Sequence, residues 1–169
     1  MKKMMALVLV LAMAVSMAAC GSKAADKAPL EGTMEENALK IMEIAPVEFM
    51  GGCIPVDMTD ADTVRYFTGL QDASKITDAA VYESMMGSQA FSLVLVRTAE
   101  GADAKTVAQE MTDNIDTRKW ICVGADEKLV AGYGDTVMLI MLDSQLGLAA
   151  QSYVDAFKSV CGADLDFTI

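Results

Sequence analysis

The chain has 169 residues, with 24 acidic and 13 basic side chains and a net charge of −11 at pH 7. This acidity excludes nucleic acid as a partner, because nucleic-acid binding requires basic patches. The absence of histidine excludes Ser-His-Asp and Cys-His catalysis and removes the commonest ligand of zinc.

Residues 1–21 have the pattern of a secretory signal. Lys2 and Lys3 precede an apolar run of 16 residues, 4–19, which only Ser16 interrupts. Spanning a bilayer takes about 20 apolar residues. We therefore expect 1–19 to be a cleaved signal peptide rather than a transmembrane helix.

The apolar run ends in Met17-Ala-Ala-Cys20-Gly21, which resembles the lipobox of bacterial lipoproteins, with Met17 at the usual Leu position. The resemblance implies that the Cys20 thiol receives a diacylglyceryl group and that cleavage makes Cys20 the first residue. Two or more acyl chains hold a protein stably at a membrane. An ordinary signal peptide with an incidental cysteine is the alternative. We predict lipid attachment at Cys20 and a protein anchored to the extracytoplasmic face of the cell membrane.

Residues 20–32 are small and charged, contain a proline and show no hydrophobic period, so we expect a lipidated N-terminus and flexible tether. Residues 33–169 are then a single globular domain of ordinary size. Removal of Lys2 and Lys3 leaves 11 basic and 24 acidic residues, a net charge of −13.

Two helices are expected first. Thr33-Met-Glu-Glu36 is a capping box, and its helix runs to Pro46. Thr59-Asp-Ala-Asp62 resembles a second capping box, and Gly69 is suited to end that helix. The sequence between them, Met-Gly-Gly-Cys-Ile-Pro at 50–55, is typical of a turn-rich break.

Two strand pairs and two helices follow. Strands are predicted at 79–86 and 90–98, a helix from 104 to about Arg118, strands at 128–133 and 136–142, and a last helix from Ser144 that Gly162 caps. Residues 91–96 and 136–142 are apolar on both faces, which is typical of central strands. We therefore expect these two strands to form the central pair of the sheet.

The predicted fold class is α+β with the order α-α-β-β-α-β-β-α. Hairpins favour an antiparallel sheet, here of about four strands. Packing all the helices on one face of that sheet gives a two-layer domain.

In element order and hydrophobic pattern, this chain resembles the small lipoproteins of anaerobic Gram-positive bacteria that carry a domain of unknown function numbered 4358. The resemblance covers about residues 33–162. It rests on the lipobox at Cys20, the hairpin at 80–97, the helix at 107–120, the strand at 136–142 that ends in Asp143, and the final helix around 153–158. That family has no established activity, so the resemblance implies fold and location and nothing about mechanism.

The cysteine and methionine residues favour structural roles. Cys53, Cys122 and Cys161 match no metal or redox spacing; a disulfide between two of them and buried free thiols are both open. Among the nine methionines that remain after signal removal, only Met85 and Met86 are adjacent, so core filling is favoured over copper binding for them. We predict no metal site and no cofactor.

Two aromatic residues are candidates for a binding surface. Trp120, the only tryptophan, follows Arg118 and Lys119, and either contacts a ligand or closes the core where a helix ends. Tyr133 lies between two glycines at a predicted hairpin tip, a position where loops often carry function.

We expect a non-catalytic binding module rather than an enzyme, with an envelope protein as partner. The strands that are apolar on both faces leave a patch for that partner if Leu93, Leu95, Val137 or Leu139 is exposed. A small-ligand-binding envelope accessory protein is the alternative, and it requires a largely apolar pocket of several hundred cubic ångström.

Overall fold

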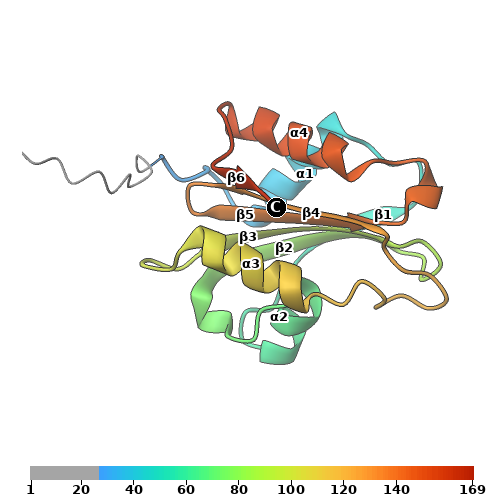
Figure 1. Ribbon diagram of the computed structural model, residues 1–169, viewed down its shortest axis with the longest axis horizontal. Coiled ribbons are helices and arrows are strands. Elements are labelled where there is room, and N and C mark those ends of the chain that lie inside the picture. Colours follow the sequence, from blue (N-terminus) through green and yellow to red (C-terminus); the bar gives the residue numbers. More distant parts are fainter. Residues whose placement is uncertain (1–26) are drawn as a thin grey trace, which may run out of the picture.

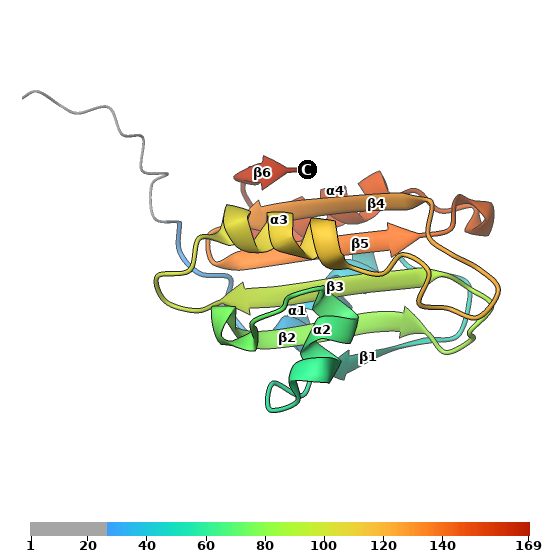
Figure 2. The same ribbon diagram turned by 60° about the horizontal axis from the view of Figure 1, so that its bottom comes forward.

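The computed structural model describes residues 27–169. Its core is one antiparallel sheet of six strands in the order β1-β2-β3-β5-β4-β6, with four α-helices (Figure 2). The strands are β1 (Gly51–Pro55), β2 (Ile76–Ser84), β3 (Phe91–Thr98), β4 (Glu127–Tyr133), β5 (Thr136–Leu142) and β6 (Phe167–Thr168). The helices are α1 (Met34–Ile44), α2 (Ala61–Thr68), α3 (Ala104–Asn114) and α4 (Ala150–Cys161), with short 3₁₀ turns η1 (Ala73–Lys75) and η2 (Ser144–Leu146).

The sheet has helices on both faces, so the expected two-layer arrangement is wrong. Helices α1 and α4 cover one face, and α2 and α3 cover the other (Figure 1). Two separate hydrophobic cores result, one on each side of the sheet. The domain is α+β with three layers.

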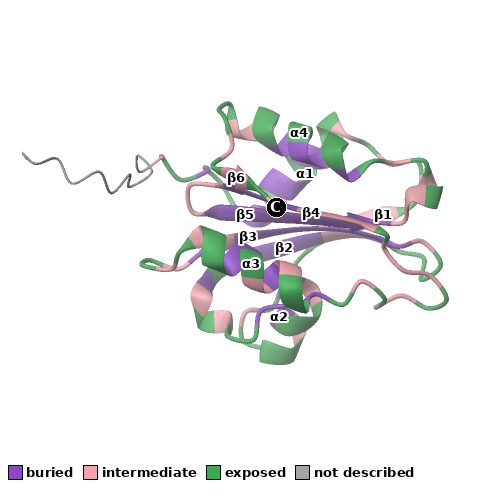
Figure 3. Cartoon of the chain, in the orientation of Figure 1, coloured by how far each residue is buried: buried purple, intermediate pink, exposed green. Residues whose placement is uncertain are grey.

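The expected central pair is confirmed, because β3 and β5 lie side by side in the middle of the sheet. Alternate residues of a strand point to opposite faces. In β3, Leu93 and Leu95 enter the core beneath α1 and α4, while Val94 and Val96 enter the core beneath α2 and α3. An apolar run on both faces of a strand is therefore accounted for by two helical layers (Figure 3).

Two of the six strands are absent from the sequence prediction of about four. Strand β1 occupies the segment expected to be a turn-rich break, and it pairs antiparallel with β2 at one edge. At the other edge, the two-residue β6 pairs with Ala131 and Gly132 of β4. The ring of Phe167 lies where a side chain at residue 132 would be: an added Cβ there would be 2.2 Å from Phe167 Cζ.

Side chains cap the starts of α1, α2 and α3, whereas α4 starts at Ala150 rather than at the predicted Ser144 and has no side-chain cap. Thr33 and Glu36 form the predicted capping box of α1, and Gly69 ends α2 in the left-handed conformation as expected. The N-cap of α2 is Asp60, one residue after the predicted Thr59. Helix α3 ends at Asn114, four residues before the predicted Arg118.

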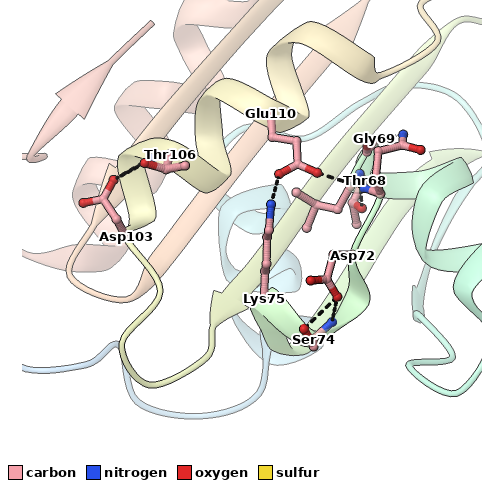
Figure 4. A network of polar contacts seen from close by, with 10 residues as sticks. Thr68, Gly69, Asp72, Ser74, Lys75, Asp103, Thr106 and Glu110 are labelled. Atoms are coloured by element: carbon pink, nitrogen blue, oxygen red, sulfur yellow. Dashed lines mark hydrogen bonds and ion pairs between the residues drawn. The ribbon is translucent and has the colours of Figure 1, made fainter.

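A polar network fastens α3 to the segment between α2 and β2 (Figure 4). Glu110 of α3 forms an ion pair with Lys75, and its Oε1 accepts a hydrogen bond of 3.0 Å from the Gln71 amide. Asp103 caps the start of the same helix, accepting bonds of 2.7 Å from the Thr106 amide and hydroxyl.

The first described residues pack against the domain rather than standing away from it. Leu30, within the predicted tether, is buried in the core beneath α1 and α4. Arg97 of β3 donates to the carbonyl oxygens of Leu30 (2.7 Å) and Gly32 (2.8 Å). Lys27 pairs with Asp166 at 2.7 Å. The chain therefore enters at the end of the sheet that carries the β4–β5 hairpin.

Candidate binding surface

The end of the sheet opposite this entry carries four exposed apolar side chains, which we call the distal tip. Met85 is 74% exposed and Ile121 is 76% exposed, with Met50 at 68% and Met86 at 52%. They come from three connections that are far apart in sequence: the segment before β1, the β2–β3 turn and the loop between α3 and β4. Exposed apolar groups gathered in one place mark interaction sites more often than scattered ones do.

Backbone contacts hold the three segments of the distal tip together. The Met85 amide donates to the Met50 carbonyl oxygen at 3.0 Å, and the Ile121 amide donates to the Gly87 carbonyl oxygen at 3.2 Å. Cys122 then turns the chain away with a φ of 72°, the only positive φ at a non-glycine among the described residues. These bonds make one surface from the three segments.

The expectation that the methionines fill the core is wrong for Met50, Met85 and Met86. It is correct for five others, which are buried: Met34, Met42, Met111, Met138 and Met141. Met85 and Met86 follow the end of β2 and lie in the turn, where their side chains pack into neither hydrophobic core. An unbranched thioether side chain adapts its shape to a partner, which suits an exposed contact surface.

Behind the distal tip, Lys119 anchors the α3–β4 loop to the sheet. Its side chain is only 1% exposed and forms an ion pair with Glu83 of β2. Its Nζ lies 3.3 Å from the Ser92 hydroxyl. The same ammonium lies 5.0 to 5.4 Å from the ring centroids of Tyr66, Phe67 and Trp120, within the range of cation–π attraction.

Burial controls the chemistry of this ammonium. Loss of solvation lowers the pKa of Lys119, and the neighbouring Glu83 carboxylate opposes that change. The buried Oε1 of Glu83 has this ion pair and no separate hydrogen bond among the described residues. A serine hydroxyl beside a lysine is a known nucleophile arrangement, but Ser92 is completely buried, so a substrate has no access to it.

The structure agrees with one part of what was expected of Trp120 and disagrees with another. Trp120 is half-buried and packs against the core beneath α2 and α3, as the core-closing interpretation requires. The helix expected to end there, α3, stops six residues earlier. Trp120 belongs to the support of the distal tip through Lys119 and does not form its exposed surface.

Tyr133 lies at the opposite end of the molecule from Trp120, so the two candidates do not form one site. It ends β4 beside the Gly134-Asp135 turn, and Lys27 Nζ lies 4.8 Å from its ring centroid. Near it is a cleft of about 640 Å³, lined by Lys27, segment 98–105, Gly134, Asp135, Asp166 and Phe167.

The cleft differs from the apolar pocket that a small-ligand receptor requires. Glu100, Asp103 and Lys105 on its wall are exposed. Other charges there already have partners: Lys27 pairs with Asp166, and Asp135 pairs with Arg97 at 3.1 Å. The cleft therefore offers few unpaired polar groups that converge on a ligand.

The apolar patch expected on the central strands is not there. Leu93, Leu95, Val137 and Leu139 are all completely buried by the protein's own helices. The condition for a partner on those strands, exposure of at least one of these residues, is therefore not met, because two helical layers cover the sheet where one was expected. The exposed apolar surface lies in the connections beyond the strand ends.

The three described cysteines are free thiols, so no disulfide joins any two of them, and Cys53 and Cys161 are half-buried. Burial raises the pKa of Cys53 to about 11 and that of Cys161 to about 12. Cys122 is exposed, contrary to the buried alternative. Within residues 27–169 there is no group of three potential metal ligands, and no helix long and apolar enough to cross a membrane. Cys20 lies outside the described residues.

In comparisons with known proteins, no family model, curated protein or solved structure matches the chain. The resemblance to lipoproteins with domain 4358 stays a prediction.

Proposed function

We propose that this protein is a lipid-anchored, extracytoplasmic binding module that presents its distal tip to a protein partner in the cell envelope. The observation that carries the proposal is the position of the tip. Met50, Met85, Met86 and Ile121 lie in the connections that hydrogen bonds join at one end of the sheet, and Figure 1 shows the N-terminal segment entering at the other end. A membrane anchor at Cys20 would leave that end free to meet other molecules.

The chemistry of the tip supports a protein partner. Methionine and isoleucine offer apolar area without directed hydrogen bonds, and methionine is enriched at protein interfaces. The buried Lys119 and its aromatic neighbours give the tip a fixed base. A small molecule would require convergent polar groups, which these four side chains do not supply.

Anchoring is tested by fractionation and mass spectrometry. We expect lipid on Cys20 in the native protein and release of the Cys20→Ala protein from membranes. Retention of the variant at the membrane would contradict the anchor. Because the change lies before the described domain, the variant's circular dichroism should match that of the parent.

Partner binding is tested by site-specific photocrosslinking in intact cells. A photoreactive phenylalanine analogue at Met85 reports on the distal tip, and the same analogue at Lys105 is the control, since that exposed residue lines the cleft at the other end. We expect a discrete crosslinked protein from position 85 that position 105 does not give. Equal products from both positions would contradict binding through the tip.

A further inference from the structure

Strand β1 is the open edge of the sheet. It pairs with β2 on one side only, and Figure 2 shows it at the border of the sheet. Ile54 is 50% exposed, and an added side chain at Gly52 would meet no atom within 4 Å. Met50 of the distal tip directly precedes the strand, so the tip and the edge are one continuous surface.

The direction of the backbone groups along β1 follows from two observed bonds. The Met50 carbonyl oxygen accepts from the Met85 amide, and the Val56 amide donates to the Ala79 carbonyl oxygen. In an antiparallel pair, such residues alternate with residues whose groups point outward. Gly51 and Cys53 therefore direct both their amide and their carbonyl outward, and Pro55 directs its carbonyl.

Exposed apolar side chains flank this edge in both helical layers. On the α1 side, Leu39 is 43% exposed and lies one helical turn after Glu35, whose carbonyl oxygen is 3.9 Å from Cys53 Sγ. On the α2 side, Tyr66 is 50% exposed and lies beside Lys119, which pairs with Glu83, the register partner of Gly52. A strand added to β1 would find apolar contacts above and below it.

The charge around the edge is strongly negative. From Glu31 to Thr68, the segment that contains α1, β1 and α2, there are eight acidic and two basic residues, a net charge of −6. Only Asp62 of these eight forms an ion pair among the described residues. The charge around β1 is therefore largely uncompensated and favours a basic partner.

We propose that β1 is a strand-addition site for an extended segment of another protein, one that carries lysine or arginine between apolar residues. The backbone of Gly51 and Cys53 would supply hydrogen bonds, as in other sheet-edge complexes. The acidic residues of α1 and of the α2 region would select positive charge. The inference rests on the proposed binding function and names the surface and the chemistry of its partner.

A second copy of this chain is a poorer occupant of the same edge. Antiparallel pairing of β1 with itself would bring the two acidic regions together, and like charges across an interface oppose association. In the register centred on Cys53, Pro55 would face Gly51 without an amide to donate. The edge is thus better suited to a basic strand than to itself.

Amide hydrogen exchange measured by NMR distinguishes strand addition from other binding. The probes are a blocked peptide of alternating lysine and valine and its glutamate–valine counterpart, added to the mature protein in nonionic detergent micelles. We expect the lysine peptide to slow exchange at Gly51 and Cys53, by about 100-fold at a peptide concentration of 100 times Kd. Gly52 and Ile54 are internal controls, because their amides already face β2.

A matched pair of variants tests the charge selection. Ile54→Lys and Ile54→Glu place opposite charges at the same exposed position. We expect Ile54→Lys to bind the lysine peptide about tenfold more weakly than Ile54→Glu at low salt, with a smaller difference as ionic strength rises. The same two substitutions leave the cores untouched, so their urea midpoints should agree.

Each other outcome overturns the inference. Equal protection by both peptides would remove the charge selection. Binding of the lysine peptide without slower exchange at Gly51 and Cys53 would refute strand addition. Protection without peptide that rises with protein concentration would show that a second copy of the chain occupies the edge. A tip-specific crosslink in cells with no protection by either peptide would leave the proposed function standing and this inference refuted.

Discussion

Replacing Lys119 by methionine tests whether the buried ion pair supports the α3–β4 loop. The ammonium side chain is 1% exposed and its partner Glu83 is 21% exposed. Methionine retains most of the apolar contact with the surrounding aromatic rings. The main loss is therefore the charge, which leaves the Glu83 carboxylate largely buried without its partner.

The magnitude follows from that geometry. Removal of one member of a buried ion pair costs about 3–5 kcal/mol, and the residual solvent access of Glu83 places Lys119→Met at the low end, about 3 kcal/mol. With a urea dependence of about 2 kcal/mol per molar, the unfolding midpoint falls by about 1.5 M. This is a large part of the ~5–15 kcal/mol that stabilises a domain.

Urea unfolding followed by circular dichroism and by Trp120 fluorescence measures this loss. The exposed Lys105→Met is the control and should stay within about 0.5 kcal/mol of the parent. Adding Glu83→Leu to Lys119→Met removes the uncompensated carboxylate and should recover most of the loss. The reasoning is refuted if Lys119→Met unfolds at the parent's midpoint, or if the second substitution lowers the midpoint further.

Three further predictions concern other parts of the molecule. Glu110→Gln should lower the urea midpoint by about 0.3–0.5 M at pH 7. The Lys75 ammonium, together with the Gln71 amide, holds the pKa of Glu110 below its usual range. The stabilisation from these contacts is therefore present above the ordinary carboxyl pKa and is lost as pH falls through the folded pKa. The midpoints of the parent and the variant should accordingly converge as pH falls below the folded pKa of Glu110, and a constant gap would contradict the linkage. In the Cys20→Ala protein, a thiol reagent at pH 8 should modify Cys122 rapidly and Cys53 and Cys161 only after unfolding. Thiols of pKa about 11 and about 12 are at most ~0.1% ionised there, and rapid loss of all three native thiols would contradict this shielding. Gly132→Val should displace the Phe167 ring and cost about 1–3 kcal/mol, whereas the same change at the open Gly52 should cost less, and equal midpoints for the two variants would argue against the packing of β6 on β4.

The central sheet was predictable from hydrophobic pattern, whereas its edges were not. The runs at 91–96 and 136–142 are apolar on both faces, a pattern that signals a doubly covered strand. Strands that are apolar on both faces require helices on both faces of the sheet, and the two-layer prediction placed helices on only one. Strand β1 contains Gly51 and Gly52, which show no alternation because they have no side chain. Strand β6 is two residues long and forms only because β4 is there to pair with it.

The candidate surface was less predictable than the fold. The distal tip joins Met50, Met85 and Ile121 from three separate connections, and sequence pattern gives no distance between such segments. Methionine is also ambiguous in sequence, since the same side chain serves cores and interfaces. Trp120 was the nearest signal: its basic neighbour Lys119 proved to be the buried cation that supports the loop. Tyr133 lies at the other end of the sheet and is unconnected to it.

The opposite placement of chain entry and distal tip also has a mechanical consequence. A pull between a lipid on Cys20 and a partner held at the tip would act nearly along the strands. The hydrogen bonds between antiparallel strands lie perpendicular to that direction, so they would be loaded together rather than broken one after another. After the ion pair of Lys27 with Asp166, the next contacts to bear the load would be those of Arg97 with the carbonyl oxygens of Leu30 and Gly32. Because Arg97 belongs to the central strand β3, the force would pass directly into the middle of the sheet.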